Sequence, residues 1–334
     1  MNKVDMGITI IVPIYNVEKY LAECLESLYK LNIPDMEVIL IDDGSTDNSY
    51  AVARKYAEKH LEKTILIQKE NGGLSSVRNF GIHIARKKYI AFIDSDDFVD
   101  CEKFENLLRE GAEKDLDVIV GNLMYYMDGK TGKPLFRSEH IRDCGVVSGI
   151  DFFHNSFEKP KCFREEVVAS FYKTEFLRKN NLFFTEGILH EDSEFTPKVL
   201  LKAEKIGYLG YPFYFYRQRS GSIMSKVTDK SNISLEKICY SLFEDYKNCT
   251  SQKGKTVLSK LIISYYKVIL YRAYHKGVGV AEAHEKYRYF FKNLHGFANK
   301  NFEETMLYFS VSLTNRIRKA VKGEITNEQK QPEI

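Results

Sequence analysis

Residues 89–97 read YIAFIDSDD, a run of five largely apolar side chains that passes directly into a group of three carboxylates. A short apolar run of this kind predicts a buried β-strand. Beyond the strand, Asp94 and Asp96 would point to one side of the extended chain and Asp97 to the other. The repulsion among these carboxylates favours a hard divalent cation with oxygen ligands, which could clamp a diphosphate. A solvated acidic turn that caps the next helix explains the same residues about as well.

The segments around this run repeat its organisation. Three earlier apolar runs each predict a strand, and each is followed by apolar residues at helical spacing. This β-α-β-α order predicts an α/β fold, with a mainly parallel sheet and helices on both faces. Ligands of such sheets bind at the carboxyl ends of the strands. The other strands are expected at Ile8–Val12, Val38–Ile41, Thr64–Ile67 and Asp117–Val120, the last one after a helix to about Lys114.

The chain beyond residue 121 is less regular. Residues 122–147 predict a hairpin excursion, residues 148–202 predict helices with loops, and Tyr208–Arg217 predicts an aromatic strand. From Leu235 onward helical spacing dominates, with aromatic residues and lysines interleaved.

The composition fits a soluble globular protein, because hydrophobic residues make up 44% of the 334 residues and charged residues 28%. The net charge of +3 gives no global field that would indicate nucleic-acid binding. The charge is uneven, since residues 231–334 hold 17 Lys and Arg against 10 Asp and Glu. The first residues do not read as a signal peptide and the six cysteines form no C-x-x-C pair, so we expect reduced thiols in a cytoplasmic protein. No uncharged apolar run approaches the ~20 residues of a membrane-spanning helix.

Three further motifs are ambiguous when each is taken alone. Asp42-Asp43-Gly44 follows the second strand and could be a turn or a helix cap. Asn71-Gly72-Gly73 could offer backbone N–H groups to a phosphate or could be only a turn, and Glu191-Asp192 reads as the acidic start of a helix. The motifs G-x-G-x-x-G, G-x-x-x-x-G-K-[ST] and G-x-S-x-G are absent, which weighs against dinucleotide dehydrogenases, P-loop proteins and α/β-hydrolases.

Taken in order, these stretches are far more specific than any one of them. They are Ile11–Asn16, Ile41–Asp47, Asn71–Asn79, Phe92–Asp97, His190–Asp192 and Tyr214–Arg217. Their order and spacing resemble the family-2 glycosyltransferases, whose Rossmann-like GT-A domain would cover about residues 6–220. The resemblance implies an inverting, metal-dependent transferase that moves a hexose from a UDP-sugar to a glycan or lipid-linked glycan, with Mn²⁺ or Mg²⁺ as cofactor. In bacteria such enzymes build capsule, exopolysaccharide or lipid-linked repeat units, so bacterial surface polysaccharide synthesis is the implied pathway.

The resemblance also implies roles for the residues that would hold the donor. Asp43 would accept a hydrogen bond from the uracil ring and Tyr15 would stack on it. A basic residue of the family lies near the nucleotide at the position of Arg78. The remaining donor-binding positions are Pro13 beside the uracil, and Arg217 and Ser222, which would close over the diphosphate.

Five carboxylates would carry the chemistry. Asp97 would be the direct metal ligand, Asp96 would lie near the ribose and the metal, and Asp94 would be a supporting member. Asp192 resembles the catalytic base of the family, with Glu191 beside it. Displacing UDP from a sugar needs a base for the acceptor hydroxyl and charge relief for the leaving diphosphate, which carboxylates and a divalent cation can supply.

We expect a catalytic domain over residues 1–220, with its acceptor side at about 122–220, and a mainly helical, basic and aromatic region over 221–334. That region would either bind a membrane surface, leaving the enzyme peripheral on the inner face of the cell membrane, or pack as a plain bundle on the catalytic domain or on a second copy in a homo-oligomer. One predicted helical face carries Leu258, Leu261, Ile262, Tyr265 and Ile269, and a basic cluster carries Arg316, Arg318, Lys319 and Lys322.

Other functions remain open from the sequence. The acceptor could be a protein-borne or wall-polymer glycan. The chain could also be a non-catalytic partner subunit that keeps the fold, although the intact carboxylates argue against this. A nucleotide-sugar pyrophosphorylase is disfavoured, because no Gly-rich loop with Arg and Lys lies near the N-terminus.

Overall fold

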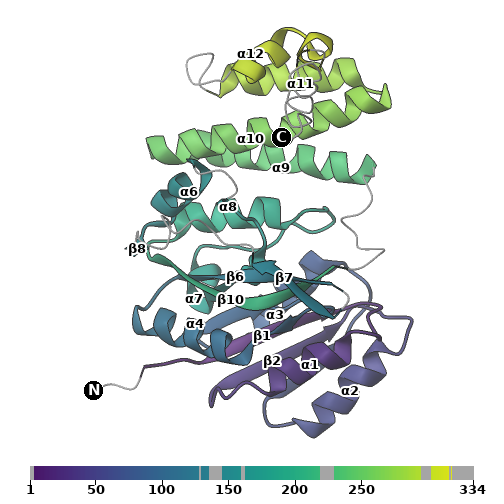
Figure 1. Ribbon diagram of the computed structural model, residues 1–334, viewed down its shortest axis with the longest axis vertical. Coiled ribbons are helices and arrows are strands. Elements are labelled where there is room, and N and C mark those ends of the chain that lie inside the picture. Colours follow the sequence, from purple (N-terminus) through teal and green to yellow (C-terminus); the bar gives the residue numbers. More distant parts are fainter. Residues whose placement is uncertain are drawn as a thin grey trace, which may run out of the picture. The chain divides into compact units, whose positions relative to one another are not determined.

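Figure 1 shows the chain as a computed structural model, which describes residues 4–127, 129–134, 145–158, 162–218, 229–294, 302–315 and 317. Contacts between residues divide the chain into two compact units, Met1–Ser231 and Asn232–Ile334. In the described part of the chain, no helix is both long enough and apolar enough to cross a bilayer. The cysteines that the structure describes are free thiols: Cys24, Cys101, Cys162, Cys239 and Cys249.

Among the described residues, a sheet of ten strands forms the centre of the first unit. The strands are β1 (Ile8–Ile14), β2 (Met36–Asp42), β3 (Thr64–Gln68), β4 (Tyr89–Phe92), β5 (Phe98–Val99), β6 (Val118–Met127), β7 (Lys130–Pro134), β8 (Val146–Val147), β9 (Ser170–Lys173) and β10 (Ile206–Arg217). Their order is β3-β2-β1-β4-β9-β6-β10-β5, and β7 pairs with β6 while β8 pairs with β10.

The sheet is mainly parallel, as the sequence predicts. β1 runs parallel to β2 and β4, β2 runs parallel to β3, and β6 runs parallel to β10. β9 is antiparallel to both of its neighbours, β4 and β6. The strands β1, β2, β3, β4, β6 and β10 therefore all point in one direction, and their carboxyl ends meet at one edge of the sheet.

The helices of the first unit connect and cover these strands. Asp100 caps one of them by accepting the backbone N–H of Lys103 at 3.1 Å. Gly81 allows another to approach β1 closely, because a Cβ at this position would stand 2.7 Å from the side chain of Ile11. The helices are α1 (Leu21–Tyr29), α2 (Ser49–Lys59), α3 (Leu74–Ile84), α4 (Cys101–Glu113), α6 (Gly149–Glu158), α7 (Thr174–Lys179) and α8 (Asp192–Lys202), with a 3₁₀ turn at Val167–Ala169.

The strand β9 differs from the sequence prediction, which expected only helices with loops over residues 148–202. Its side chains alternate between the two faces of the sheet. The ring of Phe171 lies 4.5 Å from that of Phe104 in α4, whereas the ring of Tyr172 lies 5.9 Å from that of Phe195 in α8. The four-residue strand is thus buried between helices on opposite faces. Both faces of the sheet are covered, as predicted.

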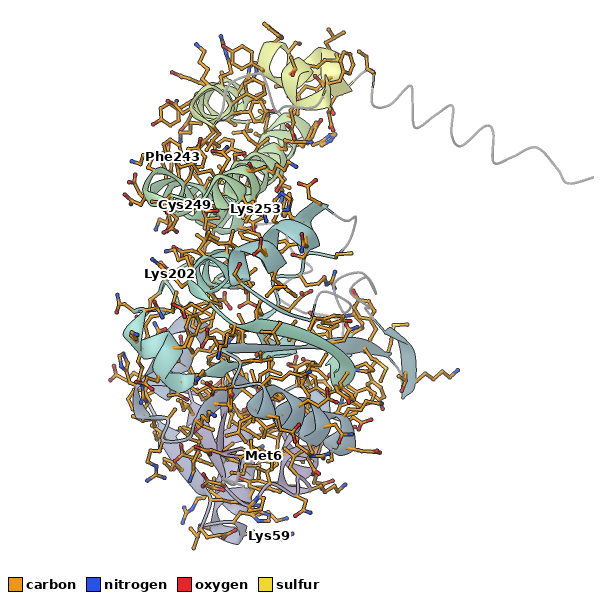
Figure 2. The ribbon with its side chains drawn as sticks, turned by 90° about the vertical axis from the view of Figure 1, so that its left-hand side faces the viewer. Met6, Lys59, Lys202, Phe243, Cys249 and Lys253 are labelled. Atoms are coloured by element: carbon orange, nitrogen blue, oxygen red, sulfur yellow. The ribbon has the colours of Figure 1, made fainter. Side chains whose placement is uncertain are left out.

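The second unit is helical in its described part, with α10 (Gln252–Lys276), α11 (Val280–Asn293), α12 (Phe302–Phe309) and most of α9 (Asp229–Asn248). The aromatic ring of Phe290 lies 5.1–5.5 Å from those of Tyr240, Phe243 and Tyr266, which joins α9, α10 and α11. Figure 2 labels Phe243 among the side chains of these helices. The apolar face predicted on α10 is buried: it comprises Leu258, Leu261, Ile262, Tyr265 and Ile269. The basic cluster of Arg316, Arg318, Lys319 and Lys322 lies outside the described residues.

Candidate active site

The carboxyl-terminal edge of the sheet gathers the predicted site residues of the first unit. Asp43 follows β2, the segment Asp94–Asp97 follows β4, and Arg217 ends β10. β1 lies between β2 and β4, and its end leads to Tyr15, an exposed side chain, whereas Pro13 is buried opposite Ile41 of β2. This is the edge at which an open α/β sheet binds its ligand.

Asp43 holds the turn that opens α3. Its buried carboxylate accepts the backbone N–H groups of Gly72 and Gly73 at 2.9 and 2.8 Å, and it forms an ion pair with Lys69 at 2.6 Å. Its backbone carbonyl accepts a hydrogen bond from the side chain of Asn71 at 3.0 Å. The motifs Asp42-Asp43-Gly44 and Asn71-Gly72-Gly73, each ambiguous in the sequence, are therefore joined by hydrogen bonds into one turn structure. Lys69 was not anticipated, because only the fold brings it to Asp43.

The loops after β1 and β2 are tied together next to Tyr15. Asn16 adopts a left-handed conformation, with φ of 52°, which Asn tolerates better than most residues. Its side chain accepts the backbone N–H of Thr46 at 2.8 Å, and its own N–H donates to the Ser45 hydroxyl at 3.1 Å. These contacts fix the backbone on either side of the predicted uracil site. Asn16 and Ser45 are further residues that sequence reasoning did not assign.

The end of β10 fixes the acidic segment after β4. Asp97 is buried, and its carboxylate accepts the Tyr214 hydroxyl at 2.6 Å and the backbone N–H of Arg217 at 2.7 Å. The same Tyr214 hydroxyl accepts the backbone N–H of Asp94 at 3.2 Å. Burial, together with the neighbouring charges of Asp96 and Asp94, raises the pKa of Asp97 well above its usual value. Tyr214 thus orders the carboxylates, a role the sequence did not reveal.

The acidic segment offers carboxylate oxygens as ligands for a divalent cation, but its side chains do not surround an ion by themselves. Among the described residues, no three His, Cys, Asp or Glu side chains are grouped so as to hold an ion by themselves. Mg²⁺-like cations are commonly held by one or two carboxylates plus substrate phosphates. Asp94 and Asp96 are half-buried at the strand end and fit that arrangement. Direct ligation by Asp97 stays a prediction, and it would compete with the hydrogen bonds from Tyr214 and Arg217.

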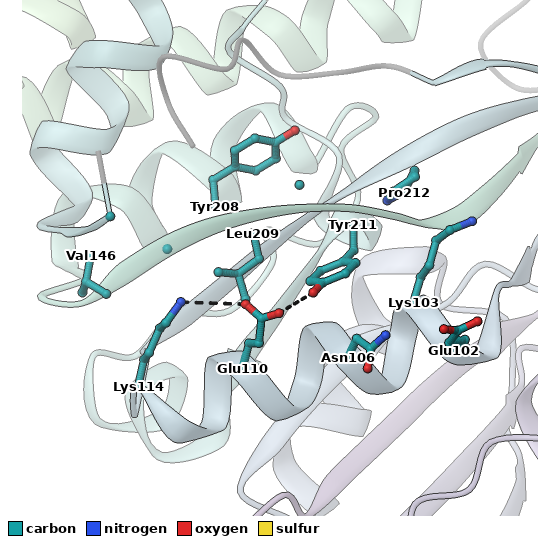
Figure 3. A pocket seen from close by; sticks show the side chains of 13 residues that line it. Glu102, Lys103, Asn106, Glu110, Lys114, Val146, Tyr208, Leu209, Tyr211 and Pro212 are labelled. Carbon is teal, nitrogen blue, oxygen red and sulfur yellow. Dashed lines mark hydrogen bonds and ion pairs between the residues drawn. The ribbon is translucent and has the colours of Figure 1, made fainter. Parts of the chain in front are cut away.

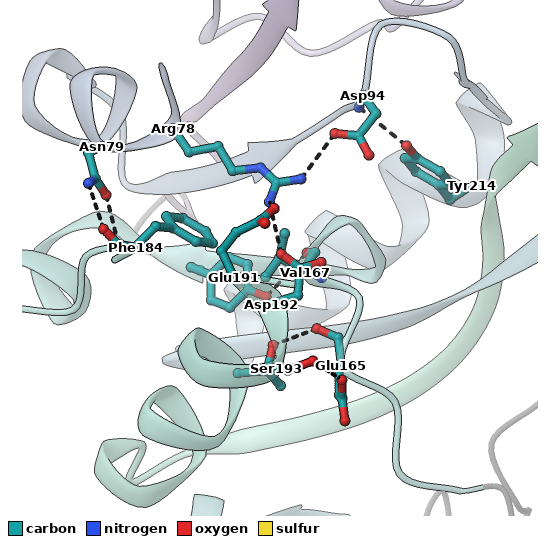
Figure 4. A network of polar contacts seen from close by, with 12 residues as sticks. Arg78, Asn79, Asp94, Glu165, Val167, Phe184, Glu191, Asp192, Ser193 and Tyr214 are labelled. Atoms are coloured by element: carbon teal, nitrogen blue, oxygen red, sulfur yellow. Dashed lines mark hydrogen bonds and ion pairs between the residues drawn. The ribbon is translucent and has the colours of Figure 1, made fainter. Parts of the chain in front are cut away.

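Arg78 joins the acidic segment to the Glu191-Asp192 pair (Figure 4). Its buried guanidinium donates to Asp192 Oδ1 and Glu191 Oε1, both at 2.8 Å, and to Asp94 Oδ1 at 3.1 Å. It also lies over the ring of Phe184, 5.2 Å from the centroid. The structure therefore brings Arg78 to three carboxylates, and the position near the nucleotide that the resemblance implies for it stays a prediction.

The pKa values of this cluster follow from burial and charge. Burial alone would lower the pKa of Arg78, but Asp192, Asp94 and Glu191 outweigh it and keep the pKa above its usual value. Burial raises the pKa of Asp192 to about 7, with Glu191 and Asp94 adding to the rise and Arg78 opposing it. A carboxylate with a pKa near neutrality is suited to take a proton at the operating pH.

Glu191 and Asp192 are not ordinary helix caps. Glu191 occupies the N-cap position of α8 but makes no capping hydrogen bond with its side chain. Asp192 directs one oxygen to Arg78 and the other to the backbone N–H of Val167 at 3.2 Å. The residue before them, His190, has a φ of 63°, a left-handed conformation that is uncommon for residues other than Gly, although His adopts it more often than most. The alternative that these acids only start a helix therefore does not account for their contacts.

Arg217 anchors the end of β10. Its Nε donates to the carbonyl of Asp96 at 2.8 Å and its Nη2 pairs with Glu23 at 2.6 Å. The guanidinium carbon lies 4.9 Å from the ring centroid of Tyr126 and 5.3 Å from that of Tyr20. Arg217 is thus beside the acidic segment, as expected of a residue near the diphosphate. Ser222, its predicted companion, lies outside the described residues.

A cavity of about 640 Å³ lies elsewhere in the first unit, between α4 and β10 (Figure 3). Glu110, Tyr211 and Lys114 are among its lining residues, and Glu110 accepts the Tyr211 hydroxyl and lies 3.9 Å from Lys114. None of the predicted site residues lines this cavity. Because Glu110 is already engaged by Tyr211 and Lys114, the chemistry is better supported at the strand ends.

Comparisons with known proteins place these features in a family. A sequence profile described as "Glycosyl transferase family 2" matches residues 9–180. The curated protein GlyG of Streptococcus pneumoniae serotype 4, a glycosyltransferase, is 34% identical over 235 residues, which make up 67% of this chain and 75% of GlyG. GlyA of the same organism, also a glycosyltransferase, is 33% identical over 234 residues, which make up 68% of this chain but 33% of GlyA. The chain thus spans only a third of this relative.

TarS of Staphylococcus aureus matches in both sequence and structure. It is described as a poly(ribitol-phosphate) beta-N-acetylglucosaminyltransferase and is 30% identical over 224 residues, or 66% of this chain and 37% of TarS. A crystal structure of TarS residues 1–349 in complex with UDP-GlcNAc superposes with a TM-score of 0.67 and 23% identity, covering 86% of this chain and 80% of that chain. This likeness bears on the fold, which is the GT-A fold that the sequence predicts.

Proposed function

The chain belongs to glycosyl transferase family 2, and from this we propose an inverting transfer of a hexose from a UDP-sugar to a glycan acceptor in bacterial surface polysaccharide synthesis. The observation that carries the proposal is the Arg78 cluster, in which the predicted base Asp192 is paired beside the acidic segment that would face the donor. A UDP-sugar as donor is supported by the fold shared with TarS, a protein crystallised with UDP-GlcNAc.

Asp192 would act as the general base. It would take the proton of an acceptor hydroxyl as the oxygen bonds to C1 of the sugar and the bond from C1 to the UDP oxygen breaks. Attack on the face opposite the leaving group inverts the configuration at C1. A positioned general base contributes about 10²–10⁴-fold to the rate. The pKa of Asp192, raised to about 7 by burial, supports this assignment.

Arg78 would position the base. Because its guanidinium binds Asp192 Oδ1 and Asp94 Oδ1 at once, it fixes the distance between the acceptor-side and donor-side carboxylates. A planar guanidinium can do this, whereas a lysine ammonium offers one point charge. The role proposed for Arg78 is thus indirect, through Asp192.

Donor binding would use the remaining residues at the strand ends. Pro13, Tyr15 and Asp43 would form the uracil site, with Asp43 also holding the Gly72-Gly73 turn. A divalent cation held by Asp97 and Asp96, with Asp94 in support, would neutralise the charge that develops on the leaving diphosphate. Arg217 would stabilise the same charge from the end of β10, and Ser222 would assist it.

Two alternative functions are compatible with the same fold. The acceptor could be a wall polymer, which the description of TarS as a poly(ribitol-phosphate) transferase favours. The chain could instead be a non-catalytic partner, which the intact carboxylate cluster disfavours. We also propose a catalytic domain over residues 1–220 followed by a helical region over residues 221–334. A homo-oligomer and a cytoplasmic or membrane-peripheral location are further proposals.

The experiment that tests the proposal measures UDP release from a panel of UDP-hexoses and UDP-N-acetylhexosamines, with Mn²⁺ and with a chelator. We expect metal-dependent release from one or two members of the panel. The matched control is Asp192→Asn, which should bind the same UDP-sugar without releasing UDP. Absence of both UDP binding and UDP release across the panel would favour the non-catalytic partner instead.

A further inference from the structure

Two tyrosines lie next to each other near the carboxyl ends of β6 and β10. Tyr125 and Tyr216 are partners in the parallel register of these strands, so their side chains lie on the same face of the sheet. Their rings are 6.1 Å apart at an angle of 60°, an edge-to-face arrangement rather than a stack. Tyr125 is 37% exposed and Tyr216 is half-buried. We call these two residues the tyrosine pair.

The tyrosine pair lies on the face of the sheet that meets the acidic segment. Tyr216 follows Tyr214 by two residues along β10, and the alternation of side chains places both on one face. The Tyr214 hydroxyl donates to Asp97 at 2.6 Å and accepts the backbone N–H of Asp94 at 3.2 Å. Burial, together with the charges of the acidic segment and of Glu166, raises the pKa of Tyr216 to about 12, which agrees with this placement.

Glu166 connects this face with the proposed base. The next residue, Val167, donates its backbone N–H to Asp192 Oδ2 at 3.2 Å, so Glu166 is held beside the base by the chain itself. Glu166 Oε1 pairs with Arg164 at 3.1 Å. Its buried Oε2 receives no hydrogen bond from any of the residues that the structure describes. A buried acceptor without a donor is costly, and a hydroxyl group of a bound ligand could supply the missing donor.

The strand order places the tyrosine pair on the acceptor side of the acidic segment. The acidic segment follows β4, which lies in the sheet between β2 on one side and β6 and β10 on the other. Asp43, at the proposed uracil site, follows β2. The uracil site and the tyrosine pair are therefore on opposite sides of the acidic segment, where the bond from the sugar to the diphosphate would break. A group bound at the tyrosine pair would approach from the side away from the nucleotide.

We propose that the tyrosine pair and Glu166 form the subsite for the accepting residue of the acceptor, and that this residue is a pyranose ring rather than an acyclic polyol phosphate. The C–H groups on one face of a pyranose pack against aromatic rings, and its hydroxyls donate to a carboxylate. A polyol phosphate has no ring face, and its phosphate would meet the like charge of Glu166. This subsite rests on the proposed transferase function, and it narrows the acceptor to one chemical class.

Saturation-transfer NMR on the full chain measures acceptor binding without turnover. The probes are the methyl pyranosides of glucose, galactose and N-acetylglucosamine, with ribitol 5-phosphate as the acyclic comparison, each in the presence of UDP and Mn²⁺. We expect saturation at the ring C–H protons of at least one pyranoside and none on ribitol 5-phosphate. Tyr125→Leu and Tyr216→Leu should each weaken binding of that pyranoside by about tenfold or more.

The matched control is Tyr216→Phe, which keeps the ring and should bind the pyranoside as wild type does. UDP affinity, determined by calorimetry, should equal that of wild type in every variant and so shows that each is folded.

The subsite and the transferase proposal fail in different ways. If wild type binds UDP but none of the pyranosides, the subsite is overturned while the transferase proposal stands. If wild type does not bind UDP, the transferase proposal fails and the subsite with it. Equal pyranoside binding by wild type, Tyr125→Leu and Tyr216→Leu would also overturn the subsite. Saturation of ribitol 5-phosphate that Tyr216→Leu abolishes would overturn the choice of a pyranose.

Discussion

Arg78 and Asp192, which are 114 residues apart in the chain, form an ion pair in which Nη1 and Oδ1 lie 2.8 Å apart. The same guanidinium reaches Asp94, so one buried cation links the acidic segment Asp94–Asp97 to the Glu191-Asp192 pair. This link makes the chemistry of the site sensitive to changes at Arg78 that leave every carboxylate in place.

Replacing Arg78 tests whether the link positions the base. Arg78→Lys keeps the charge but loses the planar fork, so we expect kcat to fall by about 10²-fold while KM for the donor changes little. Arg78→Met should lower stability by about 2 kcal/mol, because it leaves partly buried carboxylates without their cation. Steady-state rates and melting curves measure both effects. Equal rates for Arg78→Lys and wild type would contradict a positioning role.

The pH dependence of turnover should report Asp192. Because the base must be ionised and its pKa is raised to about 7, we expect kcat/KM to fall as pH decreases below 7. The groups that face Asp192 are Arg78, Glu191 and Asp94, and Arg78 remains charged throughout. The free energy of unfolding changes with pH in the opposite direction. Because the pKa of Asp192 is higher in the folded state, the folded state binds this proton more tightly than the unfolded state. The contribution of Asp192 to stability therefore decreases as pH rises from about 4 to about 7. A pH–rate profile that is flat between 5 and 8 would refute the assignment.

Removing Asp43 should weaken UDP binding whether or not a metal is present. In Asp43→Ala the N–H groups of Gly72 and Gly73 and the ammonium of Lys69 lose their acceptor, so we also expect a loss of about 1–3 kcal/mol of stability. Lys69→Met is the matched variant, because it removes the ion pair and keeps the acceptor of the turn. Calorimetric titration of UDP with and without Mn²⁺ measures the effect. Equal affinity in Asp43→Ala and wild type would show that Asp43 takes no part in holding the base.

If a metal binds at the acidic segment, the affinity for UDP should increase when Mn²⁺ is present. Asp97→Ala should abolish transfer and remove the increase in affinity that Mn²⁺ gives, and Asp96→Ala should remove the same increase. Only Asp97→Ala should also lower the melting temperature markedly, because Asp97 is buried and hydrogen-bonded to Tyr214. Titrations with and without Mn²⁺ separate the two effects. An unchanged metal-dependent increase in both variants would contradict a metal site at this segment.

Local sequence patterns predict much of this fold because its central strands are short apolar runs that end in polar turns. The run Ile8–Val12 and the run before Asp94 both became strands of the parallel sheet. The strand β9 was missed because its four residues are covered on both faces and show no alternation of polar and apolar side chains. A strand this short is defined by its neighbours β4 and β6 rather than by its own sequence.

The sequence and the family resemblance predict which residues belong to the site, but they do not predict which residues contact one another there. The resemblance named Asp43, Arg78 and Asp192, yet the partners of Asp43 and Arg78 come from segments distant in the sequence. Lys69 carries no local signal, because a lysine after a strand is common, and the stretch Tyr214–Arg217 belongs to the resemblance but gives Tyr214 no role of its own. Their roles depend on tertiary approach, which single-sequence periodicity does not encode.

The central claim is that Asp192 is the general base, and Asp192→Asn tests it most directly. Asparagine keeps the size of the side chain but cannot take a proton, so turnover should fall by about 10²–10⁴-fold. Glu191→Gln is the control, because this neighbour makes the same 2.8 Å contact with Arg78. The measurement is UDP release by wild type, Asp192→Asn and Glu191→Gln at equal and saturating UDP-sugar, with donor affinity determined in parallel. We predict that Asp192→Asn binds donor as wild type does and releases almost no UDP, while Glu191→Gln retains most of its turnover. Near-wild-type turnover in Asp192→Asn would contradict the claim.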